Sequence, residues 1–174
     1  MKKFIFAAFS LIGFVTINAQ QTVTLNVRLK PIQTLVVNTA QKIVNLDYVT
    51  KDDYANGVSS VNADHLNVYS TGGFQVKVKS ANAALLNGAK TIQANTIQVK
   101  ASAGSEPVTG AQYAQNVQLS ANETTLVTST VGGVDKKISI EYKGAGANAY
   151  LDNYIAGQTP TIYTTELTYT IISQ

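Results

Sequence analysis

Apolar and polar residues alternate with a period of two along most of the chain, whereas helical periodicity is weak. Such alternation is typical of β-strands that bury one face. It is clearest in residues 22–30, ahead of a proline at position 31. Every second residue of this segment is apolar: Val23, Leu25, Val27 and Leu29. The pattern stops at Pro31, which cannot donate a hydrogen bond to a sheet, and it resumes over residues 32–37.

The same alternation predicts further strands, each bounded by glycine, asparagine or other turn-forming residues. They cover residues 43–49, 65–69, 74–79, 92–101, 117–119, 124–130, 137–143 and 161–172. Eight to ten short strands without a long helix predict a single all-β domain. We expect an Ig-like antiparallel β-sandwich and keep a small barrel as the alternative. Most of these strands are shorter than the nine to eleven residues that a membrane-crossing strand needs.

Local signals add three details to this expected fold. Residues 126–130 and 138–142 flank Gly132-Gly133 and read as the clearest hairpin, in which Ile138, Ile140 and Tyr142 share a face. Thr50 and Asp53 ahead of Asn56-Gly57 predict one capped helical turn. Residues 110–116 suggest a second short turn.

The first 19 residues have the organisation of a secretory signal. Lys2 and Lys3 precede an apolar run over residues 4–15, and Ala19 closes a small-residue cleavage site. The apolar run is too short to span a bilayer core of about 30 Å. We therefore expect an exported protein that does not span a membrane. Its β-sandwich domain covers residues 20–174, and its destination is the periplasm, the cell surface or the extracellular medium.

Charge and cysteine content narrow the function further. Without the signal, 11 Lys and Arg face 10 Asp and Glu, a net charge of +1, and Lys136-Lys137 is the one pair of adjacent cations. Nucleic-acid binding normally requires a clustered cationic face, so we expect no nucleic-acid partner. The chain has no cysteine. This excludes disulfides, thiolate metal sites and a cysteine nucleophile.

Candidate catalytic and metal-binding residues are few. The one histidine, His65, follows Asp64 without a serine-hydrolase or zinc motif, so a surface or capping role is the favoured interpretation. Acidic residues near Asn56-Gly57 do not have the spacing of a calcium-binding loop. We therefore predict a protein that is not an enzyme, with no catalytic residue, metal or cofactor.

Nine tyrosines stand out in this composition. Tyrosine is amphipathic and favours both half-buried strand faces and binding surfaces. Packing on sheet faces is the favoured interpretation. In the alternative, Tyr150 and Tyr154, beside the glycine-rich residues 144–148, form a ligand loop for a cell-envelope glycan or peptidoglycan.

Sequence features at the two ends of the chain are similar to those of a known protein family. The alternating residues 22–30 lie at one end, and Gly157 lies twelve positions before Tyr169 at the other. Four residues share a face of the last predicted strand: Tyr163, Leu167, Tyr169 and Ile171. In these features the chain resembles pilin-like exported β-sandwich subunits that assemble by donor-strand exchange in the chaperone–usher manner. It also resembles small bacterial surface proteins that share the sandwich and do not polymerise.

The resemblance implies that residues 22–30 act as a donor strand that fills a groove in the next subunit. It implies partners that are other copies or related subunits, and a periplasmic chaperone. The chain departs from the family because Tyr169 is not penultimate, because no disulfide is available and because Pro31 follows without a flexible linker. A fimbria-like structural or adhesive subunit is thus one hypothesis, and a monomeric glycan-binding module is the other. In a self-contained domain, residues 22–30 are simply the first strand of their own sandwich.

Overall fold

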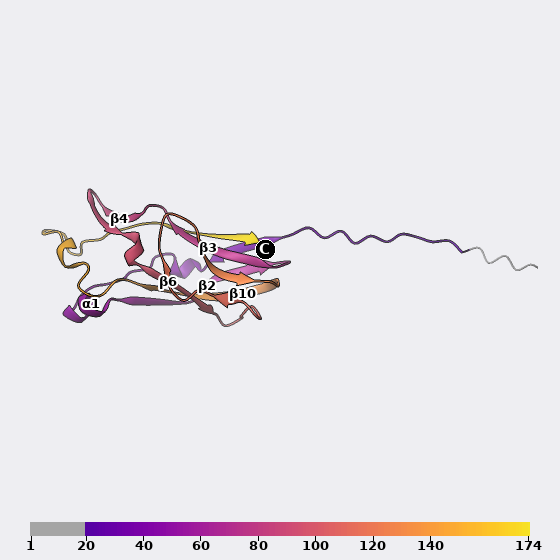
Figure 1. Cartoon of the computed structure of the whole chain (residues 1–174), viewed down its shortest axis with the longest axis horizontal. Coiled ribbons are helices and arrows are strands. Elements are labelled where there is room, and N and C mark those ends of the chain that lie inside the picture. Colours follow the sequence, from indigo (N-terminus) through magenta and orange to yellow (C-terminus); the bar gives the residue numbers. More distant parts are fainter. Residues whose placement is uncertain (1–19) are drawn as a thin grey trace, which may run out of the picture.

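The computed structural model describes residues 20–174, and the predicted signal over residues 1–19 lies outside the described residues. Two antiparallel sheets pack against each other to form an elongated body, which confirms the all-β sandwich (Figure 1). The first sheet has the strand order β1-β2-β10-β6-β8 and the second has the order β11-β3-β9-β7. A separate pair, β4 and β5, forms a short two-stranded sheet.

The strands have the following bounds. The first sheet contains β1 (Gln33–Val37), β2 (Ser59–Ser70), β10 (Gly133–Lys143), β6 (Gln98–Ala103) and β8 (Val117–Gln118). The second sheet contains β11 (Leu167–Ser173), β3 (Phe74–Ser80), β9 (Thr124–Ser129) and β7 (Gln112–Tyr113). The small sheet consists of β4 (Ala84–Asn87) and β5 (Lys90–Gln93). Short helices complete the fold: α1 (Lys51–Asn56) and the 3-10 turns η1 (Thr39–Gln41), η2 (Ala94–Thr96) and η3 (Leu151–Asn153).

The core lies between the two large sheets and follows the predicted alternation. On β3, three inward-facing residues, Phe74, Val76 and Val78, are buried. On β10, Ile138, Ile140 and Tyr142 are buried together, as predicted. Leu66 and Val68 of β2 and Leu126 and Val127 of β9 complete its centre. Period-two alternation therefore identifies the buried face of these central strands correctly.

The predicted capped helical turn is confirmed as α1. Thr50 Oγ1 accepts from the Asp53 backbone N–H at 3.3 Å, and an Asp53 carboxylate oxygen accepts from the Thr50 N–H at 2.6 Å. These reciprocal bonds form a capping box, which satisfies donors that the helix leaves unpaired. Gly57 ends the helix with a φ of +82°, a conformation that glycine adopts without steric cost.

The predicted hairpin between residues 126–130 and 138–142 is wrong. β9 pairs with β3 and β7 in the second sheet, whereas β10 pairs with β2 and β6 in the first. The glycine-containing connection between them therefore crosses from one sheet to the other. Both strands need the same alternation in either arrangement, so the pattern cannot distinguish a hairpin from a crossover.

Other predicted boundaries change because neighbouring strands decide where pairing occurs. Residues 43–49 form no strand, although Val44 and Leu46 still pack against the core. The segment predicted over residues 92–101 is divided by η2 into β5 and β6. The last strand begins only at Leu167, and Thr164 forms an isolated bridge with Leu86. The turn expected over residues 110–116 contains the short strand β7.

Candidate functional site

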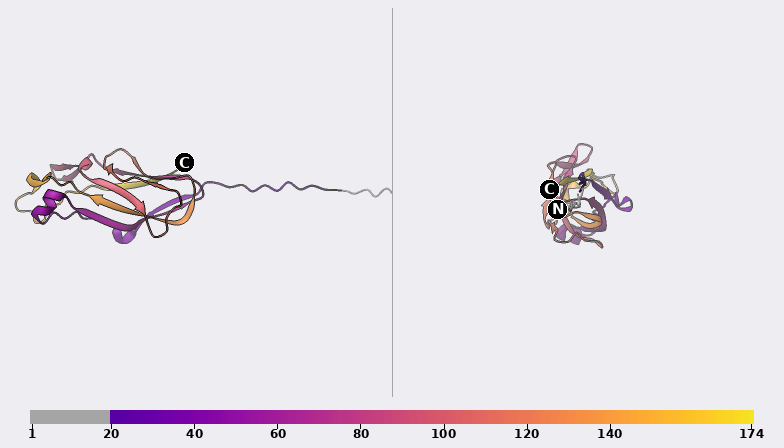
Figure 2. Two further views of the ribbon diagram at one scale, coloured as in Figure 1. Left: turned by 60° about the horizontal axis from the view of Figure 1, so that its bottom comes forward. Right: turned by 90° about the vertical axis from the view of Figure 1, so that its right-hand side faces the viewer.

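Residues 20–31, which we call the extension, leave the body as a straight segment (Figures 1 and 2). The predicted strand over residues 22–30 forms no β-ladder with any part of residues 20–174. Its four apolar side chains are almost fully exposed: Val23 by 92%, Leu25 by 87%, Val27 by 78% and Leu29 by 89%. The alternative in which this segment is the first strand of its own sandwich is therefore wrong for this structure.

Two edge strands lie next to each other on one flank of the body. Among the described residues, β1 pairs only with β2 and β11 pairs only with β3, so each strand has one backbone edge without a partner strand. The two strands belong to different sheets but lie close to each other. A free edge presents unpaired N–H and C=O groups to which another strand can add. We call this region the seam.

The inward-facing residues of the seam are only partly covered. On β11, Leu167, Tyr169 and Ile171 are half-buried against the core. On β1, Leu35 and Val37 are half-buried against the same core. Corresponding positions on the central strand β3 are fully buried. The core is therefore incompletely covered along the line where β1 and β11 meet.

Strand order explains this open flank. An immunoglobulin sandwich places strands A, B, E and D in one sheet and strands C, F and G in the other. Here β1, β2, β10 and β6 occupy the A, B, E and D positions, while β3 and β11 occupy C and F. Strand G belongs beside F, and within residues 20–174 no strand fills this position. In this comparison, the free edge of β11 lies where strand G pairs with strand F.

The residues predicted to form the strand-exchange interface lie partly on the extension and partly at or near the seam. Val23, Leu25, Val27 and Leu29 lie on the extension, and Leu167, Tyr169 and Ile171 lie at the seam. Tyr163 lies before β11, where its hydroxyl donates to the Asn153 backbone carbonyl at 2.7 Å. Gly157 has a φ of +87° and lies in the loop ahead of β11, not in a strand. Sequence reasoning missed the contribution of Leu35 and Val37, although the alternation over residues 32–37 placed them on one face.

His65 does not have the predicted surface or capping role, because its side chain is only 2% exposed. Its Nδ1 lies 3.0 Å from Gln41 Oε1, and its Nε2 lies 2.9 Å from the Tyr142 hydroxyl. The Gln41 amide nitrogen donates to the Ala63 carbonyl, so Gln41 offers its oxygen to the ring. His65 therefore donates from Nδ1. Burial lowers the pKa of His65 and so favours the neutral ring, in which Nε2 accepts.

The hydrogen-bond chain continues from His65 to the seam. The Tyr142 hydroxyl donates to His65 Nε2, and it is bonded in turn to the Tyr169 hydroxyl on β11. Burial raises the pKa of Tyr142 to about 12. Burial also raises the pKa of Tyr169, and the neighbouring Tyr142 adds to the effect. Both phenols stay neutral at ordinary pH. His65 is therefore linked to β11 by hydrogen bonds through Tyr142 and Tyr169.

Stability should therefore depend on the protonation of His65. Burial lowers the pKa of His65 below its usual value of about 6.5, so the unfolded chain binds a proton at a higher pH than the folded chain. The free energy of unfolding should fall as pH drops through about 6.5, by up to about 1.4 kcal/mol per pH unit, until the folded form is also protonated. Urea unfolding between pH 7.5 and 5 measures this slope.

The matched variant is His65→Gln, which keeps a hydrogen-bonding side chain but does not titrate. Asp53 and Asp64, whose pKa values are lowered by hydrogen bonds from Thr50 and Ser105 respectively, titrate in the acid range and act equally in both proteins. The pH dependence above pH 5 should be smaller in His65→Gln. Equal slopes in the two proteins would show that His65 is not responsible.

The suggested ligand loop is not a single exposed surface. Tyr150 is only 8% exposed, and its hydroxyl lies 2.7 Å from Thr96 Oγ1. Its ring packs edge-on against Tyr48 with centroids 5.1 Å apart, and Tyr48 packs against Tyr54 in the same way. Tyr154, by contrast, is 58% exposed. The structure therefore leaves only Tyr154 of this pair open to a ligand, and glycan binding stays a prediction.

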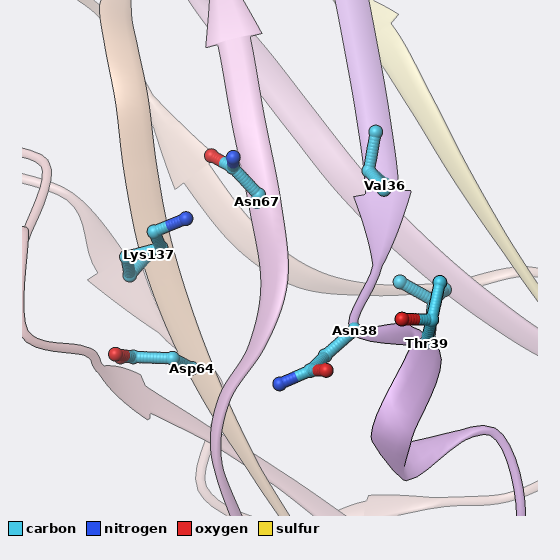
Figure 3. Close-up of a pocket in the computed structure, with 7 residues that line it drawn as sticks. Val36, Asn38, Thr39, Asp64, Asn67 and Lys137 are labelled. Atoms are coloured by element: carbon cyan, nitrogen blue, oxygen red, sulfur yellow. The ribbon is translucent and has the colours of Figure 1, made fainter.

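A hollow of about 460 Å³ lies beside β1, β2 and β10. Figure 3 shows the residues that line it. Asp64 and Lys137 are among its lining residues. The Asp64 carboxylate is already occupied, because it accepts from the Ser105 backbone N–H at 2.8 Å and from the Ser105 hydroxyl at 2.6 Å. Among residues 20–174, no three His, Cys, Asp or Glu side chains gather in a way that suits a metal ion. The hollow therefore has a mixed lining, in which Val36 and Val37 of β1 lie beside polar side chains.

Neither a protein-family model nor a curated protein sequence matches this chain. In the part of the chain that the structure describes, no helix is long and apolar enough to cross a membrane.

Proposed function

We propose that the protein is a non-enzymatic, exported structural subunit of a fimbria-like assembly, joined by β-strand complementation. Residues 22–30 of one copy lie in the seam of the next copy and take the position of strand G beside β11. The observation that carries this proposal is that one chain has both an unpaired apolar strand and a sandwich with unpaired strand edges. Within residues 20–174, the extension exposes four apolar side chains and pairs with no strand, and the edge strands β1 and β11 each have a free edge beside an incompletely covered core.

The chemistry of the two parts is complementary. The donor has one apolar face and one polar face, so its apolar side chains enter the core while its polar side chains remain in water. Each apolar side chain that becomes fully buried contributes about 1.5–3 kcal/mol. The donor backbone also supplies hydrogen bonds to β11 and β1, whose free edges otherwise remain exposed.

Dimensions support the same assignment. A nine-residue strand spans about 30 Å at the usual rise of 3.3 Å per residue. β11 has seven residues, and Thr164 ahead of it forms an isolated bridge with Leu86 of β4. The extension is thus long enough to cover the whole inward face of β11. Before assembly, a periplasmic chaperone is the partner that we propose to cover the open seam.

A peptide experiment tests the proposal. The receptor is the exported protein carrying Leu25→Asp and Val27→Asp, whose own extension cannot act as a donor. A synthetic peptide of residues 20–30 should bind this receptor and raise its free energy of unfolding, by about 2.7 kcal/mol at a hundredfold excess over the dissociation constant. Thermal unfolding over a peptide titration measures the effect.

The control peptide carries Leu25→Asp and Val27→Asp and keeps the same length and backbone. It should not stabilise the receptor, because two carboxylates would enter the core without partners. Equal stabilisation by both peptides, or no stabilisation by either, would contradict strand complementation at the seam.

A further inference from the structure

The junction between the extension and the body is held by hydrogen bonds between Ile32 and Thr71, one of which runs from the Thr71 hydroxyl to the Ile32 carbonyl at 3.4 Å. The Ile32 N–H donates to Thr71 Oγ1 at 3.0 Å, and the Thr71 N–H donates to the Ile32 carbonyl at 3.1 Å. Thr71 lies in the turn between β2 and β3. Both backbone groups of the residue that precedes β1 are therefore bound to one threonine. These contacts fix the direction in which the chain enters β1.

This direction keeps the extension away from the seam of its own chain. Gln33 pairs with Ser70 at the start of β1, and Ser173 pairs with Phe74 at the end of β11, so both lie at the end of the body where the extension leaves. To enter its own seam, the extension must reverse at Pro31 and Ile32 and form a hairpin with β1. In that position it would run parallel to β11.

The residues at the reversal point oppose a hairpin. The favoured two-residue loops, types I′ and II′, require a positive φ at their first central position. Proline is fixed near a φ of −65°, so Pro31 cannot occupy that position. A positive φ at Ile32 is also unfavourable, because its side chain is β-branched. The reversal would in addition break the hydrogen bonds between Ile32 and Thr71.

We propose that Pro31, Ile32 and Thr71 determine which copy's strand fills the seam, by preventing the extension from closing on its own body. This inference rests on the proposed function. The extension of a second copy enters from the opposite end of the body and runs antiparallel to β11, without any reversal. The acceptor's own extension then stays free for the next contact. The junction thus directs the chain toward an open assembly instead of a closed monomer.

Replacing Pro31 and Ile32 with residues that favour a hairpin should convert the assembling protein into a monomer whose own extension fills its seam. The hairpin variant carries Pro31→Asn and Ile32→Gly, because Asn-Gly is a favoured two-residue loop. Its own strand would be present at an effective concentration of order millimolar, far above that of other copies. Its affinity for the peptide of residues 20–30 should fall about tenfold or more relative to the Leu25→Asp, Val27→Asp receptor. Assembly should be lost, and the monomer should unfold at a higher temperature than that receptor.

The matched control is Pro31→Ala with Ile32→Ala, which removes the same side chains without supplying a hairpin loop. It should assemble like the wild type. A second pair is made in protein carrying Pro31→Gly, which permits a type II′ loop while Ile32 is kept. In that protein, Thr71→Val removes the hydroxyl that binds Ile32 and should increase the fraction of closed monomer, while Thr71→Ser should not. If the hairpin variant fails to fold, this pair shows whether the junction prevents the extension from entering its own seam.

Assembly by the hairpin variant at the wild-type level, with peptide binding unchanged when Thr71→Val is added to Pro31→Gly, would overturn this inference while leaving strand complementation intact. Failure of the Leu25→Asp, Val27→Asp receptor to bind the peptide at all would overturn the proposed function and this inference with it.

Discussion

The exported protein carrying Leu25→Asp and Val27→Asp should be recovered as a folded monomer that no longer assembles. Both side chains are exposed in the single chain, so their replacement leaves the body unchanged. In the assembled state both would lie in the core of the next copy, where an unpaired carboxylate is strongly disfavoured. Size-exclusion chromatography and negative-stain microscopy of protein from the native host measure the loss, and circular dichroism checks the fold.

The matched control places the same charges on the other face of the same strand, as Thr24→Asp with Asn26→Asp. These side chains point toward water when the donor face is buried, so assembly should persist. Two results would contradict the account: unchanged assembly by Leu25→Asp with Val27→Asp, or equal loss of assembly in both double variants.

Alternation along the chain predicts which side chains face the core, but it does not predict whether a strand has a neighbour. The predicted strands over residues 74–79 and 137–143 are confirmed, because these central strands have partners on both sides. Residues 43–49 alternate equally well, and Val44 and Leu46 do face the core, yet no strand forms there. Residues 22–30 are the clearest example, because they alternate regularly but pair with no strand among the described residues.

The connection between β9 and β10 shows a second limit. A glycine-rich loop between two alternating segments is compatible with a hairpin and with a crossover between sheets. The choice depends on which edges the rest of the chain leaves open, which is a property of the whole fold. The same reasoning applies to the seam, because Leu35 and Leu167 become neighbours of a common open flank only through the order of strands in two sheets.

His65 shows how a local interpretation fails when long-range partners are decisive. In the sequence, His65 follows Asp64 at the start of a predicted strand, and this position favours an exposed side chain. In the structure, Gln41 and Tyr142 satisfy both ring nitrogens, so the ring is buried without an unpaired polar atom. These partners lie 24 and 77 residues away in sequence, and no local pattern indicates them.

Cysteine trapping should join two copies through the extension of one and β11 of the other. The natural chain contains no cysteine, so any disulfide reports an introduced pair. One chain carries Val27→Cys, and a second, co-expressed chain carries a cysteine at Leu167, Tyr169 or Ile171. Three positions cover the register, because a disulfide needs Cβ atoms about 3.5–4.5 Å apart and therefore nearly opposite residues.

The control chain carries Asn26→Cys, whose side chain lies on the opposite face of the same strand and should not reach the inward face of β11. The measurement that tests strand complementation most directly is non-reducing electrophoresis of these co-expressed pairs after mild oxidation. The account predicts a disulfide-linked dimer of unlike chains for Val27→Cys at one of the three positions, and none for Asn26→Cys. Absence of that dimer at all three positions, in protein that has assembled, would contradict the insertion of residues 22–30 into the seam.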